Sequence, residues 1–468
     1  MNASAPLETI PGLRGLPPLA GLCSHAAAAL PGLSVDATVA RLRRYVFLKT
    51  QSVFIQAALF NGVPEWEVKG AFSLHLWQDS EHSSWLRARI VEMRTPPHHL
   101  DKVPEPALKA FTDELRHAPD TRSLLIGLYE ILKTSFLSAL EQHLAVTNPV
   151  ADHPTRRLLA MIATEERAQL DWGRAALAAL RNGTPDTPEQ TAYAARLRAY
   201  LAASGGISGE DPRPDLAASP LPEPLARPDV PPPVTRTPRR DARFQHVWRS
   251  RGVVPPPTSP VHQRLWWMMN VRLQEMHVSE LIATVLADWA GQPWAFYHDL
   301  ARHLWDETRH CMLGEVAFAA QGIDHTTIPT HIGFAEYPNE KLPAPERYAF
   351  LWGIEQGLMV KSGKQAEVAL AQASGNELAE IFQDYDWADE VLHAAIGRRW
   401  LEPHFQTRAA MLDVYDRIRP AYDQMKVDDF ALGGRDWFPA FYQKHLAHRD
   451  PNLGRPEPAA PPLAGGGY

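Results

Sequence analysis

His303-Leu304-Trp305-Asp306-Glu307-Thr308-Arg309-His310 is the stretch that decides the fold of this 468-residue chain. It places Glu307 and His310 three residues apart within a run of helical periodicity. On an α-helix this spacing brings both side chains to one face, where a carboxylate and an imidazole can bind the same metal ion. A second copy, Asp389-Glu390-Val391-Leu392-His393, lies further along the chain. The two turns together predict one di-metal site.

Two further predicted helices supply one carboxylate each. Glu280 precedes Glu307 by 27 residues (307 − 280), and Glu355 precedes Glu390 by 35 residues (390 − 355). Because a helix rises about 1.5 Å per residue, such separations return the chain through a hairpin to nearly the same height. The predicted ligands are therefore Glu280, Glu307, His310, Glu355, Glu390 and His393.

The ligand on the first of these helices has an alternative. Glu275 lies 32 residues before Glu307 (307 − 275) and suits the geometry almost as well as Glu280. We favour Glu280 because small residues, Ala283 and Ala287, extend its helical face. The repeat described below also aligns Glu280 with a polar residue of the first half.

The sequence predicts an all-α chain with two helical sets separated by a Pro-rich segment. This segment contains Pro231-Pro232-Pro233 and Pro255-Pro256-Pro257, and it buries too little apolar surface to offset its ordering entropy. The expected parts are an irregular N-terminal arm (1–34), a first helical bundle (35–203), the linker (204–260), a second bundle (261–402), and C-terminal helices with a Pro/Gly-rich tail (403–468).

Hydrophobic periodicity and turn residues divide the second set into four helices. Their expected ranges are 261–289, 294–321, 346–372 and 377–401. A Pro-containing crossover of some two dozen residues, 323–345, joins the second helix to the third. A long crossover makes these two helices parallel, which is the connection that a ferritin-type bundle needs.

The two sets form an internal repeat. His75-Leu76-Trp77 matches His303-Leu304-Trp305 at an offset of 228 (303 − 75), which aligns Asp79 with Glu307 and His82 with His310. Gly173-Arg174 matches Gly397-Arg398 at an offset of 224 (397 − 173). One duplicated unit is a simpler explanation than two independent bundles.

The first copy of the repeat lacks part of the ligand set. Gln169 falls on His393, and Gln51 falls on Glu280, so an amide stands where a His and a Glu are needed. Glu130 falls on Glu355, and either Glu166 or Glu165 falls on Glu390. We therefore expect the first bundle to be a scaffold with a degenerate site, and the alternative is a site for a single metal ion.

The ligand pattern resembles that of the ferritin-like di-iron carboxylate superfamily, in which two helices each give a Glu and two others each give a Glu-x-x-His. The match is close over residues 261–401 and looser in the first half. It implies two ferritin-like four-helix bundles in tandem. Asp306-Glu307-Thr308-Arg309-His310 is similar to the Asp-Glu-x-Arg-His signature of bacterial di-iron monooxygenases, although the second copy has Leu392 in place of the Arg. The resemblance implies that Asp306 and Asp389 each hydrogen-bond a metal-bound His of the opposing helix.

The expected cofactor is a pair of iron ions, with manganese as an alternative at one or both positions, because oxygen and nitrogen ligands without cysteine suit these metals. The resemblance implies an oxygenase that uses O2 to hydroxylate, N-oxygenate or desaturate a small organic substrate. Its electrons would come from a separate ferredoxin or reductase, since the chain has no Gly-rich dinucleotide fingerprint. The alternatives are a ferroxidase or iron-storage protein and a non-catalytic metal-binding or interaction protein.

Composition excludes other classes of function. A net charge of −7, from 47 basic and 54 acidic residues, gives no indication of nucleic acid or anionic membrane as a partner. We find no charged start followed by an apolar block, and no run long enough to cross a bilayer. The only cysteines, Cys23 and Cys311, are far apart in sequence, which favours a reducing compartment. We expect a cytoplasmic protein, and a homodimer is compatible with the sequence.

Overall fold

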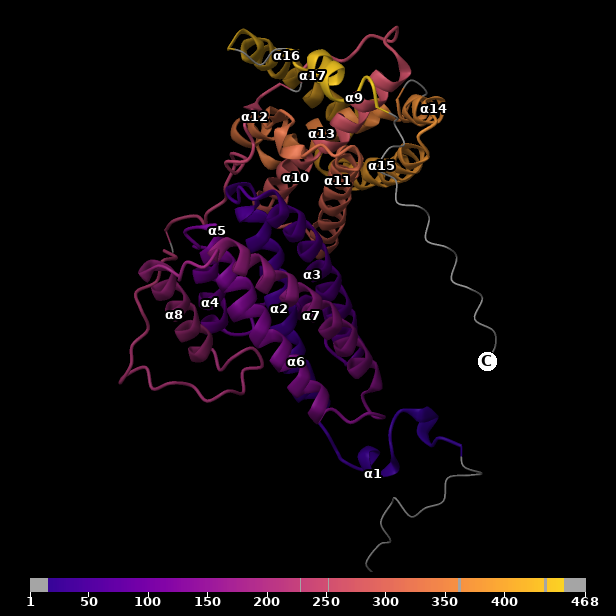
Figure 1. The fold of residues 1–468 in the computed structure, drawn as a ribbon. Coiled ribbons are helices and arrows are strands. Elements are labelled where there is room, and N and C mark those ends of the chain that lie inside the picture. Colours follow the sequence, from indigo (N-terminus) through magenta and orange to yellow (C-terminus); the bar gives the residue numbers. More distant parts are fainter. Residues whose placement is uncertain (1–15, 228, 251, 361–362, 433–435, 450–468) are drawn as a thin grey trace, which may run out of the picture. The chain divides into compact units, whose positions relative to one another are not determined.

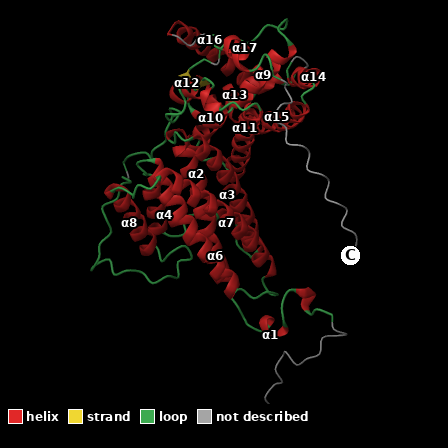
Figure 2. Cartoon of the chain, in the orientation of Figure 1, coloured by secondary structure: helices red, strands yellow, loops and turns green. Residues whose placement is uncertain are grey.

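The computed structural model describes residues 16–227, 229–250, 252–360, 363–432 and 436–449, and nearly all regular structure in them is helical (Figures 1 and 2). The predicted all-α class is confirmed. The beginning of the predicted N-terminal arm and most of the predicted C-terminal tail lie outside the described residues.

The chain divides into two compact units. The first comprises residues 1–59 and 74–233, and the second comprises residues 60–73 and 234–468. The second unit is therefore discontinuous in sequence, because it includes a short segment from the N-terminal half. One helix, α3 (Trp66–Glu92), begins in the second unit and continues into the first.

The first unit contains the predicted long helices and some shorter ones. Its elements, besides most of α3, are η3 (Leu19–Gly21), α1 (His25–Ala28), α2 (Val35–Leu59), η5 (Pro97–His99), α4 (Pro106–Leu115), α5 (Thr121–Leu125), η6 (Ile126–Lys133), α6 (Thr134–Val146), α7 (His153–Arg181) and α8 (Pro188–Ala203). Here η6 is a π-helix, and the long helices α2, α3, α6 and α7 run with nearly aligned axes in Figure 1.

The second unit contains two short strands and the helices that carry the predicted ligands. Its elements are η4 (Phe60–Gly62), β1 (Val247–Trp248), α9 (Val261–Leu273), α10 (Met276–Asp288), α11 (Trp294–Ala320), η7 (His325–Thr327), β2 (Thr330–His331), α12 (Gly333–Lys341), α13 (Ala344–Leu358), α14 (Lys364–Ser374), α15 (Glu377–Phe405), α16 (Arg408–Leu432) and α17 (Phe438–His445). The strands β1 and β2 pair in parallel, which fixes the end of the Pro-rich segment to the crossover between α11 and α13.

Four of these helices pack around a common interior. α10 contacts α11, α11 contacts α15, α15 contacts α13, and α13 contacts α10. The predicted second and fourth helices are continuous, as α11 and α15. The predicted first and third helices are each interrupted, into α9 and α10 and into α13 and α14. The first interruption is a short 3₁₀-type turn in which the amide of Glu275 donates to Arg272 O and that of Val278 donates to Glu275 O.

The matching glycines of the repeat mark equivalent close approaches between helices. A Cβ at Gly397 on α15 would overlap the indole ring of Trp352 on α13, and a Cβ at Gly173 on α7 would overlap the ring of Tyr129 on η6. Only glycine allows an aromatic ring to lie so close to the helix backbone. This similarity supports the duplication inferred from the sequence.

We expect Gly397→Ala to lower the free energy of unfolding by about 1–3 kcal/mol, because Trp352 must leave its position to admit the methyl group. Gly357→Ala is the matched control, since a Cβ at Gly357 on α13 meets no atom within 4 Å. Alanine there should leave stability unchanged or raise it by up to about 1 kcal/mol. Urea denaturation of both variants checks the difference, and equal stabilities would contradict the predicted close packing.

One described stretch, Thr121–Val146, is long and apolar enough to cross a membrane, which the sequence analysis did not anticipate. It consists of α5, η6 and α6, and 72% of its most apolar window is buried inside the structure. Such burial is typical of a core helix of a soluble protein, so this stretch is weak evidence for a membrane span.

Candidate metal centre

Buried His and carboxylate side chains from α11, α13 and α15 form a first cluster, which we call cluster A: His303, Glu307, Glu355 and His393. His303 Nε2 lies 3.0 Å from Glu355 Oε1 and 3.3 Å from Glu307 Oε1. His393 Nδ1 lies 3.2 Å from Glu307 Oε1. One donor atom from each of the four residues lies within 4.8 Å of the others, which is a spacing that one metal ion can bridge.

A second cluster, which we call cluster B, lies on the other side of Glu307. It consists of Glu275, His310 and Asp386, and His310 also groups with Glu307 and Glu390. His310 Nδ1 lies 3.4 Å from Asp386 Oδ1, 3.6 Å from Glu275 Oε2 and 3.7 Å from Glu307 Oε2. Glu307 directs one oxygen toward each cluster, so its carboxylate is placed to bridge two ions.

Five of the six ligands predicted from the sequence come together in these clusters: Glu307, His310, Glu355, Glu390 and His393. Glu280 does not, and its selection is corrected. Its buried carboxylate instead pairs with Lys69 and with Arg240, whose Nη2 lies 3.0 Å from Glu280 Oε2. Glu275, the alternative ligand, belongs to cluster B instead. Glu275 lies in the turn between α9 and α10, where its carboxylate meets His310 and Arg272, whereas Glu280 lies within α10 and its carboxylate meets Lys69 and Arg240.

The contacts that the resemblance implies for Asp306 and Asp389 are present in the structure. Asp389 on α15 contacts His310 of α11, with 3.1 Å between His310 Nε2 and Asp389 Oδ2. Asp306 on α11 receives His393 of α15, at 3.4 Å. In each histidine the other ring nitrogen, Nδ1, faces the clusters. These contacts orient both rings with a free nitrogen toward the centre.

Sequence reasoning missed two members of the clusters, His303 and Asp386, although a signal was available. Each lies four residues before the Glu of a Glu-x-x-His turn, so the full patterns are His303-x3-Glu307-x2-His310 and Asp386-x3-Glu390-x2-His393. Positions i, i+4 and i+7 share one helical face. The recurrence of His303 as His75 in the first half indicates by itself a shared packing role. Here its ring also stacks on His393, with 3.9 Å between ring centroids.

Several donor atoms in the clusters make no hydrogen bond within the described part of the chain. They are both carboxylate oxygens of Glu355, Glu390 Oε2, His310 Nδ1 and His393 Nδ1, and all are buried. Four of them lie within 4.0 Å of an ion-pair partner without forming a hydrogen bond, such as Glu355 Oε1 with His303 Nε2 at 3.0 Å, and a metal ion would satisfy all five. All are oxygen or imidazole nitrogen donors, which suits iron or manganese. The residues present therefore fit a pair of such ions.

Without metal, the site holds protons. Burial would lower the pKa of His310, but Asp386, Asp389 and Glu307 outweigh it and raise the pKa to about 10. The pKa of His393 is likewise raised, against burial, by Asp306 and Glu307. Burial raises the pKa of Glu275 to about 8. Two imidazolium ions and a neutral carboxyl group therefore balance part of the carboxylate charge near pH 7.

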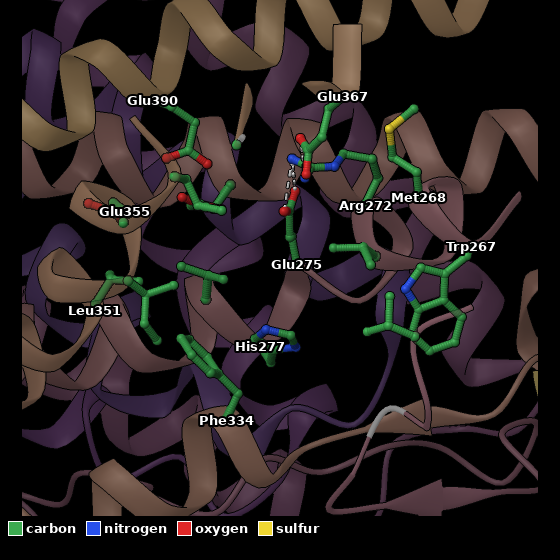
Figure 3. A pocket seen from close by; sticks show the side chains of 18 of the residues that line it. Trp267, Met268, Arg272, Glu275, His277, Phe334, Leu351, Glu355, Glu367 and Glu390 are labelled. Atoms are coloured by element: carbon green, nitrogen blue, oxygen red, sulfur yellow. Dashed lines mark hydrogen bonds and ion pairs between the residues drawn. The ribbon is translucent and has the colours of Figure 1, made fainter. Parts of the chain in front are cut away.

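An elongated cavity of about 750 Å³ opens onto both clusters. Its lining includes the carboxylates Glu275, Glu307, Glu355 and Glu390, and Figure 3 shows three of these with the apolar groups of Trp267, Leu351 and Phe334. Residues of α9 line it from Arg264 through Trp267 and Met268 to Val271, and Glu275 follows in the turn after this helix. Gly357, which meets no neighbour within 4 Å, also lines the cavity, so space and not helix contact accounts for this glycine.

The first unit contains an equivalent cluster of Asp79, His82 and Glu166. These are the residues that the repeat aligns with Glu307, His310 and Glu390. Partner contacts are also duplicated. His82 Nε2 lies 2.8 Å from Glu165 Oε2, and Glu165 falls on Asp389 at the 224-residue offset (389 − 165). Gln169 Nε2 lies 2.8 Å from Gln78 Oε1, and Gln78 falls on Asp306 at the 228-residue offset (306 − 78).

Two buried lysines occupy the cluster in the first unit. Lys49 Nζ lies 2.6 Å from Asp79 Oδ1 and also contacts Glu166. Lys133 Nζ lies 3.0 Å from Asp79 Oδ1 and 3.6 Å from Glu166 Oε1. Glu130, which the repeat aligns with Glu355, pairs instead with Arg181 at 2.7 Å. The two ammonium groups balance the two carboxylates, so this cluster is neutral without metal.

Comparison with known proteins identifies no relative: no family model, curated protein or solved structure matches the chain.

Proposed function

We propose that the second unit is a ferritin-like four-helix bundle with a di-iron centre that uses O2 to oxidise a small organic substrate. The observation that carries this proposal is the set of buried, unsatisfied oxygen and nitrogen donors in clusters A and B. The proposed ligands are His303, Glu307, Glu355 and His393 for one ion, and Glu275, His310, Asp386 and Glu390 with Glu307 for the other. Manganese is the alternative metal at either position.

When bound, such a pair of ions would supply the electrons and the binding site for O2. A hydroxylation or N-oxygenation of this kind takes one oxygen atom into the substrate and releases the other as water. It consumes two electrons and two protons, and a desaturation forms two waters with the same external input. No dinucleotide fingerprint was found in the sequence, so a separate ferredoxin or reductase is the proposed electron donor.

The chain's own residues would control access and orientation. Apolar and aromatic side chains of the cavity, including Trp267, Leu351 and Phe334, would hold the substrate and exclude bulk water from the carboxylates. Asp306 and Asp389 would keep the histidine rings aligned. A cavity of about 750 Å³ is in the range of small-molecule sites, which favours an organic substrate over iron storage. We further propose a cytoplasmic protein, and a homodimer is compatible with it.

Anaerobic loading with Fe(II) tests this function. We expect two iron ions per chain, an absorption change when O2 is added, and loss of both effects in Glu307→Ala, since Glu307 faces both clusters. Glu355→Gln should lose the ion of cluster A. Its repeat counterpart Glu130→Gln is the matched control and should retain both ions, because Glu130 pairs only with Arg181.

Each alternative function predicts a different result. Hundreds of irons per assembly would favour storage. Failure to bind iron or manganese, or binding that does not depend on Glu307, would contradict the di-metal centre altogether.

A further inference from the structure

A buried lysine contacts the proposed metal ligands of cluster B. Lys364 is the first residue of α14, directly after the interruption that follows α13, and only 1% of its surface is exposed. Its Nζ lies 2.7 Å from Asp386 Oδ2 and 3.0 Å from Glu390 Oε1. A further carboxylate, Glu367, lies 3.8 Å away. An ammonium group at this position neutralises two of the carboxylates, Asp386 and Glu390, that a divalent ion in cluster B would use.

Arginine 272 approaches the same cluster from the first helix. The Arg272 guanidinium contacts Asp386 and lies 2.9 Å from Glu275 Oε1. The side chain is buried, and Glu367 at 3.5 Å is its remaining carboxylate partner. Figure 3 shows Arg272 facing Glu275 and Glu367 at the cavity. Two fixed positive charges therefore face the carboxylates of cluster B.

Cluster A differs in this respect. Among the described residues, neither Glu307 nor Glu355 pairs with a lysine or arginine, and their ionic partners are histidines. Imidazole can remain and ligate when metal enters, whereas an ammonium group has no lone pair to offer and must move away. The two proposed metal positions are therefore electrostatically unequal.

The first unit provides an internal precedent for this arrangement. Lys49 on α2 and Lys133 at the end of η6 contact both Asp79 and Glu166. In the first unit the two basic side chains come from α2 and η6. In the second unit Arg272 comes from α9 and Lys364 from α14, which belong to the predicted first and third helices. In the first unit these charges complete a neutral cluster. In the second they contact only cluster B.

We infer that Lys364 is an internal cation that occupies the cluster B metal position, so that the two ions bind in order. The inference rests on the proposed di-metal function and adds a regulation of it. Cluster A fills first and tightly. Cluster B fills only when the Lys364 ammonium leaves Asp386 and Glu390, and its affinity is reduced accordingly. The interruption between α13 and α14 gives Lys364 a place at a helix end, where it can withdraw without unwinding a helix interior.

Anaerobic titration with Co(II), followed by its absorption spectrum and by elemental analysis, tests the inference without relying on activity. In the unmodified chain we expect a first equivalent that binds at least tenfold more tightly than the second. In Lys364→Met the second equivalent should bind at least tenfold more tightly than before, because no ammonium competes, while the first changes little. Lys341→Met is the matched control, since Lys341 is an exposed residue at the end of α12.

Lys364→Arg keeps the charge and should retain the weak second equivalent, so it reports on the proposal even if the methionine variant folds poorly. Two equivalents of equal affinity in the unmodified chain, or an unchanged second affinity in folded Lys364→Met, would overturn the ordered binding while leaving the di-metal function intact. If no Glu307-dependent metal binds in any variant, the proposed function itself fails.

Discussion

Glu280→Gln should lower the free energy of unfolding by about 3–5 kcal/mol and leave the metal content unchanged. The carboxylate of Glu280 is fully buried between Lys69 and Arg240, both of which are also buried. Replacing it with an amide leaves two positive charges without a counter-charge in a dry interior, which is among the most destabilising of single substitutions. Neither metal cluster includes Glu280. Denaturant unfolding and metal analysis of the same preparation give both quantities.

Glu275→Gln is the matched comparison and should have the reverse outcome. Glu275 belongs to cluster B, and its partner Arg272 keeps Asp386 and Glu367 when the charge of Glu275 is removed. We therefore expect a small loss of stability and a clear loss of the second metal equivalent. If Glu280→Gln lost metal while Glu275→Gln retained it, Glu280, the ligand favoured from the sequence, would be correct and the assignment of Glu275 to cluster B would be wrong.

Metal binding should strengthen steeply with pH. The pKa of His310 is raised to about 10, that of His393 is raised, and that of Glu275 is raised to about 8. A raised pKa means that the proton remains on the metal-free site at neutral pH, and a metal ion must displace it. Each displaced proton changes the affinity tenfold per pH unit, so the release of two to three protons raises the product of the two binding constants by about 100- to 1000-fold per unit.

These pKa values give the direction of the change in metal affinity with pH and the pH range in which it occurs. Between pH 6 and 7.5 all three groups hold their protons, and the affinity rises along the full slope. The slope decreases as pH passes about 8, where Glu275 loses its proton without metal, and again near 10, where His310 does. Calorimetric titration in buffers of different ionisation enthalpy counts the released protons directly. Binding constants that do not change over this range would contradict the protonation described for the metal-free site.

The sequence was sufficient for the two continuous helices α11 and α15 and for five of the residues that the structure brings together, because the decisive patterns are local. Glu307 with His310 and Glu390 with His393 are each set by one helical turn, and the repeat indicated the register of their helices. Strong periodicity on long helices made these positions predictable. The Asp306 and Asp389 contacts were expected only from the resemblance of the Asp306–His310 stretch to the Asp-Glu-x-Arg-His signature, and not from the residue spacing.

The remaining residues depend on tertiary contacts that no local pattern encodes. The choice between Glu275 and Glu280 is decided by Lys69, which lies more than 200 residues earlier in the chain, at 280 − 69. Lys364 enters the site only because the third helix is interrupted, whereas its periodicity indicated a continuous helix from 346 to 372. The small residues Ala283 and Ala287 favoured Glu280 over Glu275 in the sequence. This preference was misleading, because a small residue can face a packed neighbour as readily as a metal site.

Because the second unit is discontinuous in sequence, a cut at the linker does not yield two complete units. Residues 60–73 carry Lys69 and Glu67, which pair with Glu280 and with Arg243 of the C-terminal half. A gene fragment that begins at the Pro-rich segment would encode every proposed metal ligand and retain Arg240, but it would lack Lys69, one of the two counter-charges of Glu280. The two halves of the duplicated chain therefore cannot be exchanged as independent units. A recombination breakpoint at the linker would separate the proposed metal centre from residues 60–73, which belong to the same unit.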